Sequence, residues 1–486
     1  MTQLHSDTSR ARLWARCAAV VMGVVVLSVN LWAPVGAYAD DVRDREYWLD
    51  ASNIRKAWEI SQGEGVKVAV IDTGINGDVD VLKGAVVGGT DVSGAGAPNG
   101  QEPLGPGEEQ KQHGTMVASL LAGRGVDKNP PTDASATPDP NQVGAGPDGV
   151  IGVAPKAELL SISLWVGPNN PGGLSIEEQI PVAVKYAVDQ GAKVINMSLG
   201  SNSTTWPQSW DEAFKYAEDN DVVIVAAAGN RDSGITQVGA PATIPGVLAV
   251  GGLDKNGKAS EGSSSQGISI SITAPAEELV GVAPNGITVN WQGTSGAAPL
   301  VSGAAALIRS KYPDMSAAQV IQQLICGAKD GVGCQSGKPD PIYGYGKLDV
   351  YQALTMDAPK VDANPIGSMS EWIRLHRRND TPPPTDGNAT PNPGESSAEI
   401  PQAQVPTAIE PESVSGVVPG AVVIGFGALV FLVLVGGTWH IVATRKKLAA
   451  AGADSGAPDG AGHGAHVAGE RGETPENPGD SSQTPT

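Results

Sequence analysis

The chain has 486 residues, of which 40% are hydrophobic, and its 52 acidic residues outweigh its 32 basic residues to give a formal net charge of −20. Phosphate backbones would repel so acidic a chain, which excludes nucleic acid as a partner. The length would accommodate roughly two or three domains, but shifts in composition indicate one folded domain between segments of other kinds.

The first segment, residues 1–39, has the layout of a secretory signal peptide. Arginines between residues 10 and 16 precede an apolar run, 17–32, and a small-residue site follows at 37–39. A signal anchor that stays uncleaved is the alternative, because the basic region is long. Both interpretations place the following domain outside the cytoplasm.

A single folded domain is predicted over residues 40–356. Its apolar segments are short, rich in β-branched residues and typical of strands buried on both faces of a parallel sheet. They are Val66–Ile71, Leu159–Leu164, Val194–Met197, Val222–Ala228 and Val247–Val250. Because amphipathic segments alternate with these strands, the sequence predicts an α/β fold with a mostly parallel central sheet and right-handed crossovers.

Amphipathic patterns predict helices over Ile176–Gln190 and Ser209–Asn220. Ser175 and Glu178 have the spacing of a capping box at the start of the first helix. Pro181 lies inside that helix, and because proline lacks a backbone N–H and clashes with the preceding turn, it would delay the start or bend the helix.

The pattern changes after Gly251. Ser269–Thr273 alternates polar and apolar residues, and Val280–Val282 and Ile287–Val289 are expected to form an antiparallel pair. A long helix of small residues is then predicted over Gly296–Tyr312.

Two cysteines, Cys326 and Cys334, remain once the signal peptide is removed, on either side of a Gly-rich turn. In an oxidising compartment this spacing favours a small local disulfide over two free thiols. Two cysteines with no histidine nearby do not make a metal site. The sequence therefore predicts a disulfide, no metal and no cofactor.

The remainder of the chain has the composition of a membrane tether. Residues 357–416 are rich in Pro, Ser, Asn and Thr and predict an extended stalk. The apolar run 417–443 is long enough to cross a bilayer as a helix, and the basic residues 445–447 place the following tail inside the cell. A buried core helix is the alternative for this run. The tail, 444–486, predicts disorder.

One basic island with a tryptophan, Met369–Arg378 (MSEWIRLHRR), interrupts the stalk. Docking on a partner or on lipid headgroups would suit these residue types. A solvated turn of the linker is the interpretation that the sequence alone favours.

Three residues of the types that cooperate in nucleophilic catalysis lie in suitable contexts. Asp72 ends the first strong strand, at the edge where α/β sheets place their sites. His113 is the only histidine between the signal peptide and the stalk, although a lone histidine is by itself more often structural. Ser295 lies just before a helix whose first N–H groups would point at the group it attacks. This chain order is one of the few known for a Ser/His/Asp triad.

The segments around these residues resemble the motifs of the subtilisin-like serine proteases, or subtilases. The matching blocks are VAVIDTGI, HGTMVASLLAG, GVAPKAELL, VINMSLGS, VAAAGN and GTSGAAPLVSGAAAL, within roughly Trp58–Leu354. The resemblance implies a subtilisin-like three-layer sandwich and a serine endopeptidase. Ser295 would be the nucleophile, His113 its general base and Asp72 the residue that orients the imidazole.

The resemblance also implies roles for residues around the triad. Asn230 would donate to the oxyanion together with the Ser295 N–H. The implied substrate-binding residues form an edge that pairs with an extended peptide and the wall of a roomy pocket for the side chain before the cut: Ser198, Leu199 and Gly200 for the edge, Ala227, Ala228 and Gly229 for the pocket.

A rival interpretation comes from the sequence Asp72–Gly74, which would also suit an aspartic protease, where two carboxylates share a proton. That mechanism needs a second copy. The only candidate in the domain, Asp232–Gly234, does not follow an apolar strand. We therefore prefer the serine protease interpretation.

The order of segments is similar to that of the mycosins, membrane-anchored subtilases that accompany type VII secretion systems. Residues 40–71 leave no room for a folded inhibitory propeptide, and Gly125–Gly149 matches a long mycosin loop. The chain departs from the family in having no cysteine in its N-terminal extension, Met116 in place of a common histidine, and Gly296 where most subtilases have a larger residue. Gly296 is expected to loosen the start of the helix that carries Ser295.

The resemblance implies a single-pass protein of the cell membrane, with an extracytoplasmic catalytic domain and a cytoplasmic tail. Its partners would be protein or peptide substrates, membrane components of a type VII secretion complex, and the lipid bilayer. Two alternatives stay open: a structural component of the secretion complex whose proteolysis is dispensable, and a general housekeeping subtilase of the cell surface.

Overall fold

The computed structural model describes residues 41–128, 142–334 and 338–377. The predicted signal peptide, the predicted membrane-spanning run 417–443 and the predicted tail lie outside these residues. Within the three described ranges, no helix combines the length and the hydrophobicity that crossing a bilayer demands.

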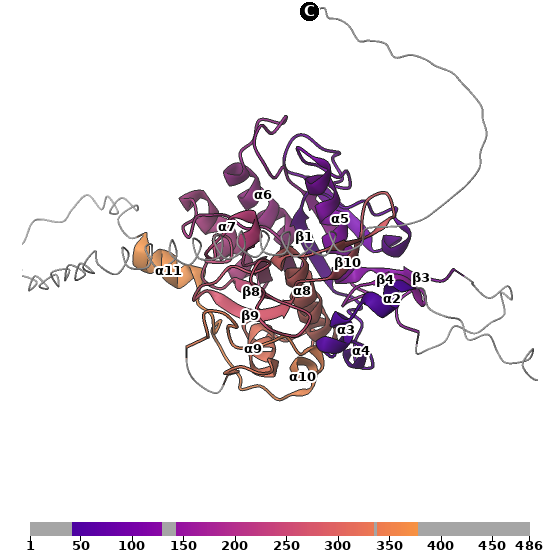
Figure 1. Ribbon diagram of the computed structural model, residues 1–486. Coiled ribbons are helices and arrows are strands. Elements are labelled where there is room, and N and C mark those ends of the chain that lie inside the picture. The colour runs from indigo at the N-terminus through magenta and orange to yellow at the C-terminus, as the bar shows by residue number, and fades with distance from the viewer. Residues whose placement is uncertain (1–40, 129–141, 335–337, 378–486) are drawn as a thin grey trace, which may run out of the picture. The chain divides into compact units, whose positions relative to one another are not determined.

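A parallel sheet forms the centre of the described part of the chain (Figure 1). Its strand order is β2-β5-β1-β6-β7-β8-β9. Its strands are β1 (Lys67–Asp72), β2 (Val86–Asp91), β5 (Glu158–Ser163), β6 (Val194–Met197), β7 (Val223–Ala227), β8 (Leu248–Leu253) and β9 (Ile270–Pro275). Their pairings are parallel throughout. The predicted α/β fold with a mostly parallel central sheet is confirmed.

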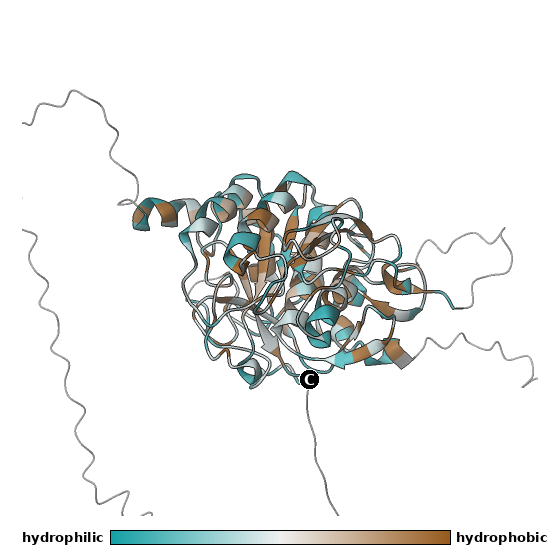
Figure 2. Ribbon diagram, turned by 90° about the horizontal axis from the view of Figure 1, so that it is seen from above, coloured by the Kyte–Doolittle hydropathy of each residue, from teal (hydrophilic) through white to brown (hydrophobic). Residues whose placement is uncertain are grey.

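Helices cover both faces of this sheet. The apolar side chains of α6 (Ile176–Asp189) and α7 (Asp211–Asp219) pack into the core on one face. Those of α5 (Glu108–Ala122) and α8 (Thr294–Lys311) pack into the core on the other. Figure 2 shows hydrophobic residues gathered in the central strands. The other helices of the described residues are α2 (Asp41–Arg45), α3 (Trp48–Ala51), α4 (Ile54–Ala57), α9 (Ala317–Gly327), α10 (Val350–Thr355), α11 (Met369–His376) and the short 3-10 turns η1 (Asp80–Leu82), η2 (Gln208–Trp210) and η3 (Arg231–Ser233).

Small residues let α8 run through the interior of the domain. The helix is buried from Thr294 to Arg309 apart from Ser295, and it contacts β6, β7, β8 and β9. A Cβ added at Gly303 would lie only 2.5 Å from the Cβ of Val153. The small-residue run in the sequence therefore reflects close packing of a central helix.

Helix α6 begins as predicted but continues through its proline. The Ser175–Glu178 capping box is present, which confirms the predicted helix start. Pro181 removes the N–H that would have bonded to the Glu177 carbonyl, and the Trp210 indole N–H donates to that carbonyl instead, at 3.1 Å. A side chain from the neighbouring η2 turn thus replaces the missing backbone hydrogen bond.

The segment after Gly251 is partly as expected. β10 (Leu279–Val282) and β11 (Thr288–Trp291) form the predicted antiparallel pair. β9, however, joins the parallel sheet and is buried along its whole length, so its alternation of polar and apolar residues does not mark an exposed face. A further short antiparallel pair consists of β3 (Arg124–Val126) and β4 (Asp148–Ile151).

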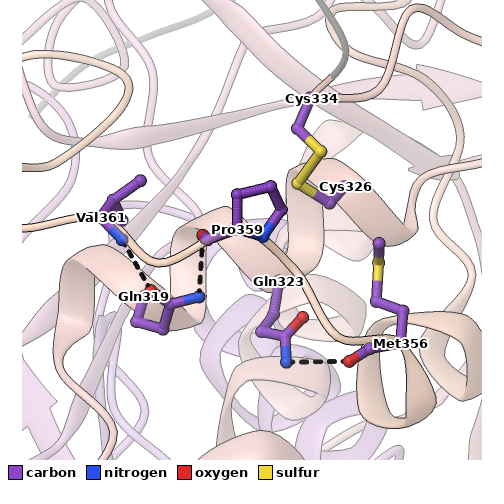
Figure 3. The surroundings of a disulfide bond; sticks show 7 residues. All are labelled: Gln319, Gln323, Cys326, Cys334, Met356, Pro359 and Val361. Atoms are coloured by element: carbon purple, nitrogen blue, oxygen red, sulfur yellow. Dashed lines mark hydrogen bonds between the residues drawn. A yellow bond between two sulfur atoms is a disulfide. The ribbon is translucent and has the colours of Figure 1, made fainter.

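The folded part of the chain extends beyond the boundary predicted at residue 356. Residues 356–377 are here called the C-terminal strap. Its first residues run along α9, where the Gln319 side chain bonds to the backbone of Pro359 and Val361 at 3.3 and 3.0 Å (Figure 3). The Gln323 side chain donates to the Met356 carbonyl at 3.3 Å. At the end of the same helix, the structure joins Cys326 to Cys334 in a disulfide.

The strap ends in α11, where a solvated turn was expected. The Glu218 carboxylate of α7 accepts hydrogen bonds from the Ser368 hydroxyl and the N–H of Met369, both at 2.6 Å. Met369 is buried, and the Trp372 ring lies 4.7 Å from that of Trp206. The basic island is therefore a helix docked on the domain.

Candidate active site

The carboxyl ends of three neighbouring strands converge at one edge of the sheet. Asp72 is the last residue of β1, Ser198 directly follows β6, and Asn230 follows β7. Helices α5 and α8, which contact each other, bring His113 and Ser295 to the same edge. The parallel topology thus gathers side chains that are far apart in the sequence.

His113 and Asp72 are in direct contact. The Nδ1 of His113 lies 2.8 Å from Oδ1 of the buried Asp72. The Thr73 N–H donates to the same oxygen at 2.7 Å, while the Thr73 hydroxyl donates to the Gln110 carbonyl and accepts from the Gly114 N–H. His113 lies in the second turn of α5, not at its start, and Thr73 ties that turn to β1.

This environment favours the charged form of the imidazole. Burial of His113 opposes the charge, but the negative charge of Asp72, its hydrogen bond and the more distant Glu109 outweigh burial, so the pKa of His113 is raised above its ordinary value.

Ser295 is the second residue of α8 and is held by a chain of polar contacts. Its hydroxyl donates to the Ser198 carbonyl at 3.3 Å, and the Ser198 hydroxyl donates to the Ser295 carbonyl at 2.8 Å. The Asn196 amide donates to the Ser198 hydroxyl and accepts from the hydroxyl of Ser302, about two turns further along α8. These bonds fix the start of α8 against β6.

The side-chain amide of Asn230 is oriented by the residue before the serine. Its Oδ1 accepts from both the N–H and the hydroxyl of Thr294, at 2.8 and 2.9 Å. A Cβ at Gly293 would lie 2.8 Å from Asn230 Nδ2, which explains the glycine at this position. Because Thr294 occupies the oxygen, the N–H groups of the amide can serve a ligand.

A cavity of about 670 Å³ unites these groups. His113, Ser295 and Asn230 line it, and so do five of the six predicted substrate-binding residues: Ser198, Leu199, Gly200, Ala227 and Gly229. The prediction that Ala228 lines the pocket is wrong, because its side chain is fully buried in the core beneath α6 and α7. Adjacent residues of an extended chain point to opposite faces, so Ala227 and Ala228 cannot both face the cavity.

Sequence reasoning missed three residues of this site. Thr73 and Thr294 orient Asp72 and Asn230, as described above. Trp291, at the end of β11, lines the cavity and meets the His113 ring edge-on, with the ring centroids 5.8 Å apart. Trp291 and Thr294 lie close to Ser295 in the sequence, which was the available signal, but only the fold shows what their side chains contact.

Comparisons with known proteins agree with this geometry. A family model described as the Subtilase family matches residues 63–346. The chain is similar to fervidolysin from Fervidobacterium pennivorans, at 31% identity over 64% of this chain and 44% of that protein. It therefore spans less than half the length of fervidolysin.

The chain is also similar to mycosin-3 from Mycobacterium tuberculosis, at 32% identity over 63% of this chain and 71% of mycosin-3. Among solved structures, MycP1 from the ESX-1 type VII secretion system resembles it with a TM-score of 0.51 and 28% identity, covering 68% of this chain and 91% of that one.

Proposed function

Because the chain belongs to the subtilase family of serine proteases and is related to the mycosins, we propose that it is a membrane-anchored extracytoplasmic endopeptidase that cleaves exported proteins through an acyl-enzyme. The observation that carries the proposal is the meeting of four groups around one cavity. They are the Ser295 hydroxyl, the His113 imidazole, the buried Asp72 carboxylate behind it, and the Asn230 amide.

The contacts suit a general-base mechanism. Asp72 occupies Nδ1 of His113, which leaves Nε2 to take the Ser295 proton as the oxygen attacks the peptide carbonyl. The Ser295 hydroxyl must first turn away from the Ser198 carbonyl. When the C–N bond breaks, His113 returns the proton to the leaving amine. Water then attacks the ester with His113 as its base, and the proton passes to the Ser295 oxygen as the acid product leaves.

The negative charge of the tetrahedral intermediate needs donors that are already in place. The Asn230 Nδ2 and the Ser295 N–H at the start of α8 are our candidates. Thr294 fixes the amide before the reaction, so no reorganisation is required when the charge develops. The first turn of a helix adds its partial positive charge.

Substrate would lie along Ser198–Gly200 as an added strand, with the side chain before the cut beside Ala227. The association with type VII secretion rests on the similarity to mycosin-3 and to MycP1. The membrane anchor rests on the apolar run 417–443.

Replacement of the native gene by a Ser295→Ala variant tests the proposal in cells. We expect precursors of exported proteins to accumulate uncut, with the variant present at its normal level. Ser269→Ala is the matched control, because Ser269 precedes β9 and so lies at the opposite edge of the sheet. Unchanged processing in Ser295→Ala cells would contradict the protease. If secretion also continues in these cells but stops in cells that lack the whole chain, the chain would be a structural component.

A further inference from the structure

The indole of Trp291 lies beside the catalytic histidine without a chemical role of its own. Its plane stands at 86° to the His113 ring, with the centroids 5.8 Å apart. Its Nε1 is buried and has no hydrogen-bond partner among the described residues. An unpaired buried donor is unfavourable, so its packing must offset that cost.

Gly296 provides the space that the indole uses. A Cβ added at Gly296, directly after Ser295, would lie 2.3 Å from Leu279 Cδ1 and 3.4 Å from the Trp291 ring. Leu279 and Trp291 face each other across the β10–β11 pair. The two side chains of this hairpin therefore fill the volume that residue 296 leaves open.

The hairpin is also fixed to the helix of His113. The Val282 N–H donates to the Ser119 hydroxyl of α5 at 3.1 Å. A Cβ at Gly281 would lie 3.1 Å from Met116 Cβ and 3.0 Å from Trp291 Nε1, so β10 lies directly against α5. The helix of the base, the helix of the nucleophile and the hairpin thus meet at one side chain.

We infer that Trp291 is a positioning residue that holds the His113 ring in line with Ser295, and that Gly296 is the small neighbour it requires. This inference rests on the proposed function. Because proton transfer from Ser295 depends on the position of the imidazole, a shift of about 1 Å would slow the reaction by about 10²-fold. Trp291 also lines the cavity, so its test must separate positioning from contact with substrate.

A small fluorophosphonate makes that separation. The Ser295 oxygen bonds to phosphorus, fluoride leaves, and the proton passes to His113. Because the leaving group is fluoride and not a peptide, contact between Trp291 and a departing peptide cannot affect the rate. In the full-length chain in detergent, we expect Trp291→Ala to be labelled about 10- to 100-fold more slowly than the parent. Trp291→Phe should recover part of the rate, because it keeps an aromatic ring beside His113 but loses the unpaired N–H and part of the indole volume. Ile287→Ala, on the same hairpin and 60% exposed, is the control and should not differ from the parent.

Two further readouts test the contact between Trp291 and His113. Gly296→Ala should slow labelling about tenfold in the parent, because its Cβ displaces Leu279 and hence Trp291, but have little effect in Trp291→Ala. The acid limb of the labelling rate should move to higher pH in Trp291→Ala. The indole no longer buries the His113 ring there, while the charges of Asp72 and Glu109 remain.

The outcomes are distinct. A parent chain that is not labelled contradicts the proposed function itself. A labelled parent with equally fast Trp291→Ala, or a Trp291→Ala defect seen with peptides but not with the probe, overturns the positioning role. If Trp291→Ala fails to fold by circular dichroism, Gly296→Ala decides, and an unchanged labelling rate in that variant overturns the inference.

Discussion

The edge of the sheet that carries the candidate active site and the C-terminal strap are held in place by different interactions. Helix α8 buries 15 of its 18 residues, whereas α11 buries only Met369. The strap is attached largely by side chains that bond to its backbone, from Glu218, Gln319 and Gln323. Close packing of small residues therefore sets the geometry of the site, and a few polar contacts set the course of the strap. Mutations in the two regions should have separate effects.

Asp72→Asn should separate activity from stability most clearly. The amide keeps the volume of the buried side chain but cannot hold His113 in the productive tautomer, so kcat should fall on the order of 10⁴-fold. The thermal unfolding midpoint should stay within a few degrees, because the packing is unchanged. Peptide hydrolysis and circular dichroism measure the two effects, and a loss of activity below tenfold would contradict the role given to Asp72.

Asn230→Ala should have the next largest effect. Removal of one oxyanion donor costs about 10²–10³ in kcat, with KM little changed, because the amide acts only as charge develops. Asn256→Ala, an exposed loop residue, is the matched control. Steady-state kinetics would contradict the assignment if the Asn230 variant raised KM and left kcat intact.

The pH profile tests the electrostatics of the site. The base must be neutral, so kcat/KM should fall as the pH drops through the pKa of His113. Burial lowers that pKa, but Asp72 and then Glu109 raise it by more, so the acid limb should lie above the ordinary value of about 6.5. Glu109→Gln should move the limb slightly downward. A limb at or below about pH 6 in the parent would show that Asp72 does not act as described.

Glu218→Gln should have the smallest effect, and only on the strap. It weakens the charge-assisted bonds to Ser368 and Met369 at the start of α11, at a cost of about 1–2 kcal/mol. Limited proteolysis should release α11 faster, with fluorophosphonate labelling unchanged. Glu212→Gln, exposed on the same helix α7, is the control. A parallel loss of labelling would show that the strap and the site are coupled after all.

The sequence predicted the site better than it predicted the strap, because the signals of the site are local. Asp72 ends a buried strand, Ser295 starts a small-residue helix, and each carries its motif with it. The helix in the strap had a local signal too, since Ser368 and Glu371 have the same spacing as Ser175 and Glu178. Its docking on Glu218, 151 residues before Met369, had no such signal.

Two finer features of the site also depend on the fold. Ala228 and Ala227 look alike in the sequence, and only the fold shows that Ala228 packs into the core beneath α6 and α7 while Ala227, on the opposite face, borders the cavity. Trp291 lies two residues beyond the predicted strand Ile287–Val289, and its contact with His113 depends on a hairpin that packs against α5.

The most direct test of the proposed protease is the site of covalent labelling. The full-length chain, treated with a fluorophosphonate and digested, should carry the phosphonyl group on Ser295 in the mass spectrum. Ser295→Ala should carry none, and His113→Ala should label far more slowly. Labelling that persists in Ser295→Ala, or a folded parent chain that does not react, would contradict the account.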